Sequence, residues 1–406
     1  MSSITTVFAS VALGAIFGAN VARGQNTSGK IVLVSLFSAV GVIVSSIFVD
    51  PLLNATVNYI SRTKDEKKLL HILTKNKPNN TNSYIVPQLN LSGDYVNIDL
   101  TLSYVQQVLC PIVNDIQEAL LSNNDRTVFI GIVGSSGSGK TTLSQLLVRS
   151  LTGLNIPSVT ISMDNYHYTN EYLDSKLHSY RKDEKGMPIT LRKVKGRSET
   201  IDSKSMLNDL KKVATIKTTK EKELLLPLYD RALHDPVPNQ LIIPNVTRVV
   251  LVEGLHLLRD FKSKEEFTFN DNDDEYWIDI RSMFTTLYYL RFDDYEVQKE
   301  RVMQRRIRGG ISREWASPRY DEIDAVVGIE IENECKRVIT NVNEKNNIVV
   351  MSMFEDEDGH VQLKRKQVYN SGLQIVEKKE PTISESIKGM IFFVSFVYLL
   401  EKINPV

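Results

Sequence analysis

The sequence predicts an α/β fold with a doubly wound parallel sheet. Three observations predict it: a glycine-rich segment at residues 134–141, an uncharged β-branched stretch directly before it, and alternating apolar strands and amphipathic helices after it. The chain has 406 residues, of which 42% are hydrophobic, so it is long enough for one large α/β domain with additional segments.

The first 60 residues are expected to form a membrane-anchor hairpin. Two apolar stretches, 4–21 and 31–49, precede the first acidic residue, Asp50, and a short loop with Arg23 and Lys30 separates them. About 20 apolar residues span the core of a bilayer. A cleaved signal peptide or a transit sequence is the competing interpretation of the first stretch. The sequence therefore predicts an N-terminal transmembrane hairpin over residues 1–60.

Residues 61–99 are expected to form a polar linker, and residues 100–378 the globular domain. The domain opens with helical spacing over 100–121, which Pro111 should kink or split because proline lacks the N–H that a helix interior uses. Residues 127–133 then read as a buried parallel strand, because they are β-branched and uncharged.

The glycine-rich segment fills the pattern G-x-x-x-x-G-K-[ST] and predicts a nucleotide phosphate site. Glycine lets backbone N–H groups surround a polyanion, and the following helix directs its positive end at it. Lys140 is placed to reach the β and γ phosphates, and the hydroxyl of Thr141 to bind Mg²⁺. We therefore expect the phosphates of a nucleotide to be bound by Gly134, Ser135, Ser136, Gly137, Ser138, Gly139, Lys140, Thr141 and Thr142.

Further strands are expected at 158–163, 249–252, 286–292 and 347–351, and two of them end in acidic residues. Asp164 follows the first of these strands, at the edge of the sheet where ligands bind in such folds. A carboxylate there suits a general base that takes the proton of an attacking hydroxyl. Glu253 follows the second and is expected beside Mg²⁺.

Two further segments indicate ligand contacts. Residues 227–236 combine aromatic, acidic, basic and imidazole side chains, a mixture found in loops that bind small polar molecules. A later helix carries Arg301, Arg305, Arg306 and Arg308, and three of these cations, at 301, 305 and 308, share one face. Beside a phosphate site this face is expected to close over a triphosphate.

These motifs together resemble the P-loop kinases of the uridine kinase, phosphoribulokinase and pantothenate kinase group. Several stretches, such as Asp164-x-Tyr166-His167 and 232–237, are most similar to fungal ATP-dependent kinases of unassigned substrate. The resemblance covers roughly residues 127–311. It implies Asp164 as base, Lys140 and Arg305 as catalytic phosphate clamps, Thr141 and Glu253 on the Mg²⁺ side, and substrate contacts from Tyr166, His167, Tyr229 and His234.

The resemblance implies an ATP-dependent kinase that moves the γ-phosphoryl of MgATP to a hydroxyl of a small molecule such as a nucleoside, sugar or vitamin. The spacing of the arginines departs from the uridine kinase pattern and leaves the acceptor open. The alternative hypothesis is a membrane-tethered ATP-binding scaffold or switch with a degenerate kinase fold.

The chain has equal numbers of basic and acidic residues, 49 Lys plus Arg and 49 Asp plus Glu, so no nucleic-acid partner is expected.

The location follows from the anchor and the ATP requirement. Residues 379–406, whose apolar run spans 389–400, are expected to form an amphipathic or membrane-associated helix. The sequence therefore predicts a membrane protein, of undetermined organelle, whose kinase domain faces an ATP-rich compartment.

The two cysteines of the chain lack the spacing of a metal site and suit a reducing compartment.

Overall fold

The computed structural model describes residues 65–74, 83–91, 94–123, 126–218, 221–259, 273–340, 347–369 and 375–376. The chain divides into two compact units, Met1–Ile72 and Leu73–Val406. In the first unit the described residues, 65–72, are helical. The account below concerns the second unit.

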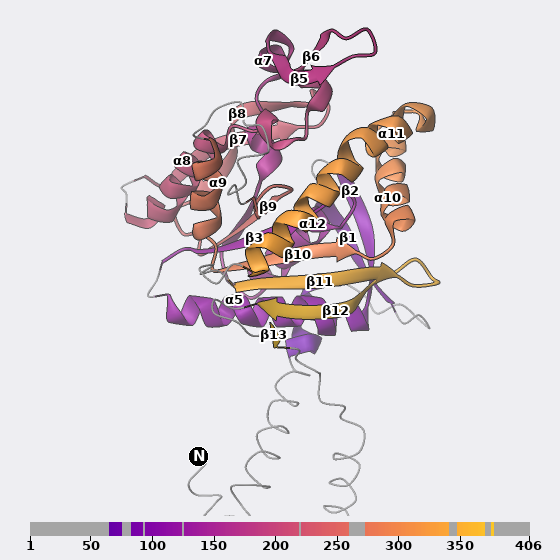
Figure 1. Cartoon of the computed structure of the whole chain (residues 1–406). Coiled ribbons are helices and arrows are strands. Elements are labelled where there is room, and N and C mark those ends of the chain that lie inside the picture. Colours follow the sequence, from indigo (N-terminus) through magenta and orange to yellow (C-terminus); the bar gives the residue numbers. More distant parts are fainter. Residues whose placement is uncertain are drawn as a thin grey trace, which may run out of the picture. The chain divides into compact units, whose positions relative to one another are not determined.

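A seven-stranded sheet forms the centre of this unit, in the order β13-β12-β11-β10-β3-β9-β4 (Figure 1). Its neighbouring strands from β4 to β11 are parallel, and β12 and β13 are antiparallel additions at one edge. The structure therefore confirms an α/β fold with a mostly parallel sheet and corrects the prediction at that edge. The strands are β3 (Val128–Gly134), β4 (Ser158–Ser162), β9 (Val249–Gly254), β10 (Thr286–Phe292), β11 (Asn347–Glu355), β12 (Val361–Tyr369) and β13 (Ile375–Val376).

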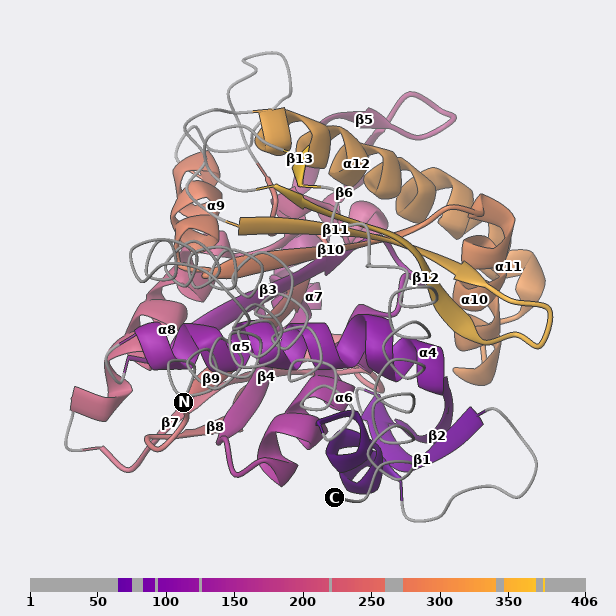
Figure 2. The same ribbon diagram turned by 90° about the horizontal axis from the view of Figure 1, so that it is seen from below.

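Helices cover both faces of the sheet. Figures 1 and 2 show α5 (Cys110–Ser122) against one face and α12 (Ala325–Thr340) against the other. On the α12 face a continuous apolar core joins alternate residues of the strands to α12, α8 (Ser203–Thr215) and α9 (Asp273–Ser282). On the α5 face the hydroxyl of Tyr288 donates to Asp115 over 2.7 Å. All seven residues of β3 are buried, because β3 lies inside the sheet and is covered on both sides.

The segment predicted as a polar linker contains an antiparallel hairpin, β1 (Ser83–Leu91) and β2 (Asp94–Thr101). The strand register shifts between Val86 and Leu89, which are both buried, whereas Ile85 is 50% exposed. The following helix starts as α4 (Leu102–Tyr104), widens to a π-helical turn over Val105–Leu109 and continues as α5. Pro111 was expected to kink or split this helix. The structure instead has a π-helical turn directly before Pro111, where the regular i→i−4 hydrogen bonds of the helix are interrupted.

The remaining elements lie in the connections between the strands of the sheet (Figure 1). They include two hairpins, β5–β6 (Leu177–Lys182 and Pro188–Thr190) and β7–β8 (Glu223–Asp230 and Asp235–Pro244). The segment 227–236, expected to be a loop, is thus the end of a hairpin whose strands pair Asp230 with Asp235. The helices are α6 (Lys140–Gly153), α7 (Asn170–Ser175), α10 (Tyr295–Arg308) and α11 (Arg313–Arg319), with a π-helical turn at Tyr320–Asp324.

The membrane location predicted from the sequence is corrected. Within the described ranges, none of the helices has both the length and the apolar character needed to cross a bilayer. The apolar stretches at 4–21, 31–49 and 389–400, on which the prediction depended, lie outside the described residues. The structure thus gives a membrane location no support.

Candidate active site

The phosphate loop connects β3 to α6, as the sequence predicts. Gly137 and Gly139 have φ values of 81° and 94°, in the left-handed region that favours glycine. A Cβ atom at Gly137 would also come within 2.9 Å of the Gln298 carbonyl oxygen. Glycine at 137 is therefore required both by the turn and by the close approach of α10.

Two side chains of α10 brace this loop. Gln298 donates from Nε2 to the Ser136 carbonyl oxygen over 2.7 Å and also to the Ser135 hydroxyl. Arg301 donates from Nε to the carbonyl oxygen of Gly137 over 3.1 Å. These bonds hold the loop carbonyls away from the anion site, so that the N–H groups remain for a ligand. The sequence analysis missed Gln298, and its spacing of three residues from Arg301 is the only local signal for it.

Lys140 lies over the loop, where its Nζ donates to the Ser135 carbonyl oxygen over 2.9 Å. Burial lowers the pKa of Lys140 to about 8, and Arg305 acts in the same direction. Glu253 and Asp164 oppose this shift. The lysine is thus surrounded by the charged groups that were expected to share its site.

The end of β9 brings Glu253 to the start of α6. The Thr141 hydroxyl donates to Oε2 of Glu253 over 2.8 Å. Burial raises the pKa of Glu253, while Lys140 and the Thr141 hydrogen bond act against the rise. A hydroxyl and a carboxylate of this kind could hold Mg²⁺, which prefers oxygen ligands and takes the rest from phosphates and water. The described residues include no cluster of three or more His, Cys, Asp or Glu suited to a metal, so a bound ion would need those other oxygens.

Asp164 lies directly after β4, in the short helix Met163–Tyr166. Its side chain is 37% exposed, and Oδ1 lies 3.8 Å from Nε2 of His167. Burial alone would raise the pKa of Asp164, but His167, Arg231, Lys140 and Arg305 together hold it below its ordinary value. The carboxylate is therefore ionised at neutral pH and accessible, as a proton acceptor must be.

His167 and Tyr229 lie beside Asp164, with ring centroids 5.6 Å apart. Nδ1 of His167 lies 3.2 Å from the Thr200 carbonyl oxygen, which places its proton there in the neutral ring. Burial lowers the pKa of His167, so the ring is neutral at physiological pH. Burial and the Asp164 charge raise the pKa of Tyr229 to about 12. Both rings thus lie beside the Asp164 carboxylate.

The structure places the other two expected substrate residues elsewhere. Tyr166 is 3% exposed and belongs to the apolar core, and its hydroxyl lies 3.4 Å from Asp209 of α8. His234 occupies the tip of the β7–β8 hairpin at φ 52°, with an exposed side chain. Its carbonyl oxygen accepts from Lys195 over 2.7 Å. Tyr166 therefore serves packing in this structure, and His234 contributes backbone.

The four arginines of α10 have separate surroundings rather than one shared face. Arg305 is exposed and interacts electrostatically with Arg231, Asp324 and Asp164. Arg301 contacts the phosphate loop, and Arg308 is exposed. Arg306 donates from Nη2 to Asp324 over 2.5 Å and from Nη1 to the Ala316 carbonyl oxygen over 2.9 Å. Arg305 is thus the arginine of this helix placed at Asp164.

Comparison with known proteins agrees with this geometry. Residues 129–269 match the model of the phosphoribulokinase / uridine kinase family. Over this segment the chain is similar to that family. It is 28% identical over 214 residues to a uridine kinase-like protein of Schizosaccharomyces pombe, covering 51% of this chain and 78% of the relative. It is 26% identical over 259 residues to the ATP-dependent kinase YFH7 of Saccharomyces cerevisiae, covering 56% and 68%.

Solved structures of related kinases show a similar fold at low identity. A D-glycerate 3-kinase of Cryptococcus neoformans aligns with 64% of this chain and 98% of its own, at 12% identity and a TM-score of 0.45. The family match and the fungal relatives, rather than this structural likeness, confirm the predicted resemblance to P-loop kinases.

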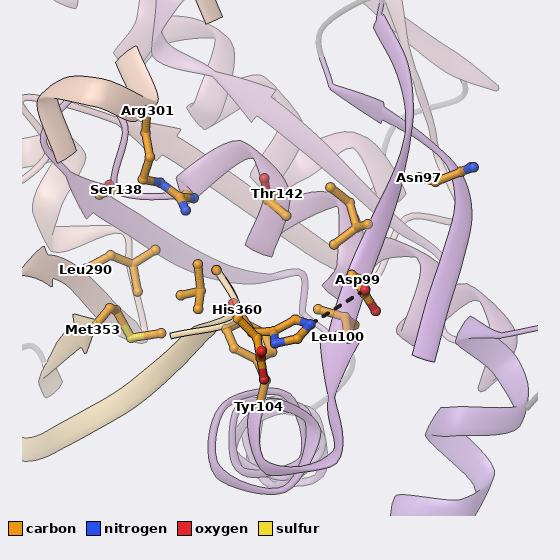
Figure 3. Close-up of a pocket in the computed structure, with 15 residues that line it drawn as sticks. Asn97, Asp99, Leu100, Tyr104, Ser138, Thr142, Leu290, Arg301, Met353 and His360 are labelled. Atoms are coloured by element: carbon orange, nitrogen blue, oxygen red, sulfur yellow. Dashed lines mark ion pairs between the residues drawn. The ribbon is translucent and has the colours of Figure 1, made fainter. Parts of the chain in front are cut away.

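A cavity of about 270 Å³ adjoins the phosphate loop of the kinase domain (Figure 3). Ser138, Gly139 and Thr142 line it on the loop side. The hydroxyl of Ser138 is buried and has no hydrogen-bond partner among the described residues. A buried donor without a partner is costly, so this hydroxyl is available for a ligand. The sequence predicted the loop residues but not the cavity, whose other walls come from distant segments.

Proposed function

We propose that this protein transfers the γ-phosphoryl group of MgATP to a hydroxyl of a small molecule such as a nucleoside, sugar or vitamin-like alcohol. The observation that carries the proposal is the placement of the Asp164 carboxylate, with its lowered pKa, beside Lys140 and Arg305 at the phosphate loop. A phosphate loop alone also occurs in proteins that hydrolyse nucleotides, so the loop does not by itself indicate a kinase.

The proposed chemistry assigns each side chain one task. The oxygen of the acceptor hydroxyl forms a bond to the γ-phosphorus, and Asp164 accepts the proton that this hydroxyl loses. At the same time the bond between the γ-phosphorus and the β-γ bridging oxygen breaks, and ADP leaves. Lys140 and Arg305 stabilise the charge of the phosphoryl oxygens. Thr141 and Glu253 would hold Mg²⁺, which neutralises the phosphates when bound. His167 and Tyr229 would border the acceptor.

Replacing Asp164 tests the proposal. In Asp164→Asn we expect kcat to fall by about 10² to 10⁴, because the amide does not accept the proton, while ATP binding persists. The measurement is acceptor-dependent ADP release across a panel of nucleosides, sugars and vitamins, with ATP affinity from calorimetry. Asp174→Asn is the matched control, since Asp174 is exposed and pairs with Arg192 away from the loop. Unchanged ADP release in Asp164→Asn, or no turnover with any acceptor, would contradict the assignment.

A further inference from the structure

Positively charged side chains from separate segments lie around Tyr229, one of the two rings proposed to border the acceptor. Nζ of Lys195 lies 5.2 Å from the centroid of the Tyr229 ring. Arg231 comes directly after β7, two residues beyond Tyr229, and Arg319 is the last residue of α11. Both guanidinium groups interact electrostatically with the Tyr229 hydroxyl. Positive charge thus gathers on the Tyr229 side of the proposed acceptor site.

The charge of Lys195 is offset within the fold. Its side chain is buried, and Nζ lies 3.5 Å from Oδ1 of Asp235. Nζ also donates to Oδ1 of Asn170 and to the carbonyl oxygen of His234, over 2.7 Å in each case. These contacts account for the donors of the ammonium group. Lys195 therefore joins α7 to the tip of the β7–β8 hairpin and serves the structure of this region.

Arg319 differs from Lys195 in this respect. Its side chain is exposed, and Nη2 donates to the Lys195 carbonyl oxygen over 3.1 Å. In the part of the chain that the structure describes, no carboxylate forms an ion pair with Arg319, because the nearby Asp324 pairs with Arg306 over 2.5 Å instead. A guanidinium has more N–H donors than this one bond uses. Arg319 thus keeps its positive charge and further donors beside Tyr229.

Arg231 is held close to the Asp164 carboxylate by the backbone. The Tyr229 N–H donates to Oδ1 of Asn165 over 2.9 Å, which ties the end of β7 to the residue after Asp164. The Arg231 side chain is half-buried and interacts electrostatically with Asp164 and with Arg305, the arginine proposed to act on the phosphoryl group. Because Arg231 and Arg305 have like charges, an anion bound near Arg231 would lower their mutual repulsion.

We propose that the acceptor of this kinase is an anionic alcohol, a small molecule that has a carboxylate or phosphate group besides its hydroxyl, and that Arg319 and Arg231 bind this group. The inference rests on the proposed function, because it names the class of the acceptor. The hydroxyl would lie at Asp164 and the anionic group on the Tyr229 side, where planar guanidinium groups fit the oxygens of a carboxylate or phosphate. A neutral sugar or nucleoside would bind more weakly, because it would displace water from Arg319 without supplying a negative charge.

Matched sets of alcohols test the inference with the full-length chain. Each set compares acids with their neutral counterpart: D-glycerate and glycerol phosphate with glycerol, D-gluconate and glucose phosphate with D-glucose, and pantothenate with pantothenol. The measurement is acceptor-dependent ADP release with ATP and Mg²⁺. In each set that supports turnover we expect kcat/KM to be at least about tenfold higher for an acid, because a hydrogen bond between charged groups is worth about that factor. The carboxylates and the phosphates distinguish the two kinds of anionic group.

Glutamine variants of the two arginines test which groups bind the anion. In Arg319→Gln and in Arg231→Gln we expect KM for the acid to rise at least about tenfold, while the ATP affinity from calorimetry is unchanged. Arg319→Lys should recover part of the loss, because lysine keeps the charge but not the planar fork. Arg126→Gln is the matched control, since Arg126 is exposed and precedes β3 at the amino end of the parallel strands, away from the phosphate loop.

The outcomes separate this inference from the proposed function. A neutral alcohol that is turned over as efficiently as its acid would overturn the inference and leave the proposed function intact. The same holds if KM for the acid is unchanged in either glutamine variant, or if it rises equally in Arg126→Gln. If neither the acids nor the neutral alcohols support ADP release, the proposed function fails, and this inference fails with it.

Discussion

Single residues at the phosphate loop could be predicted from the sequence because their chemistry is encoded in consecutive positions. The motif at 134–141 fixes its own geometry, and Asp164 and Glu253 lie at the carboxyl ends of the neighbouring parallel strands β4 and β9. Tyr166 shows the limit of this reasoning. Nothing local distinguishes a tyrosine in the core from one in the site, and here α8 provides the apolar surroundings that bury it.

The charge state of Lys140 gives a pH dependence at the residue scale. Because its pKa in the free site lies at about 8, below that of an exposed lysine, the ammonium loses its proton as the pH rises through that value. We expect KM for ATP to rise above pH 8, approaching about tenfold per pH unit, while kcat changes little because bound phosphate restores the proton. Steady-state kinetics from pH 7 to 9.5 measures both constants.

Lys140→Arg provides the control for this titration. A guanidinium remains charged throughout the range, so the KM of the variant should not climb with pH, whatever its value at pH 7. If the KM of the wild-type protein for ATP did not change up to pH 9.5, the prediction would be wrong. Lys140 would then keep its proton over this range, because its charged neighbours would offset the effect of burial on its pKa.

At the scale of elements, the alternation of strands and helices predicted the parallel sheet, but contacts between distant elements stayed hidden. Gln298 reaches Ser135 and Ser136 from a helix more than 160 residues further along the chain. The hairpin β1–β2 was hidden for another reason: the buried residues of β1, at 83, 86 and 89, recur at every third position and so lack the alternation that predicts a strand.

Two adjacent arginines of α10 should separate chemistry from stability. Arg305 lies near Asp164, so Arg305→Ala should lower kcat by about 10³ or more with little change in unfolding free energy. Arg306 forms a mostly buried pair with Asp324 that joins α10 to the turn after α11, so Arg306→Ala should cost about 3–5 kcal/mol. Urea unfolding and kinetics on both variants give the comparison. Equal effects on stability would contradict the separate roles.

At the scale of the whole molecule, occupation of the site should stabilise the described domain. A ligand that binds the folded state alone adds about 2.7 kcal/mol at a concentration of 100 Kd. We therefore expect ATP with Mg²⁺ to raise Tm by a few degrees in calorimetric scans, and the shift to shrink in Lys140→Ala because that variant loses its phosphate contact. A Tm that does not respond to ATP would contradict nucleotide binding at the loop.

The reversal of direction between β11 and β12 has a consequence for how this kinase could diversify. The parallel strands end at the ligand edge, and a crossover helix would carry the chain away from it. Because β12 instead runs back beside β11, the connection is a turn of a few residues that stays at the ligand edge, next to the cavity. Insertions or exchanges in that turn would leave the strand ladder intact, so the lining of the cavity can change there while the sheet and the phosphate loop are kept.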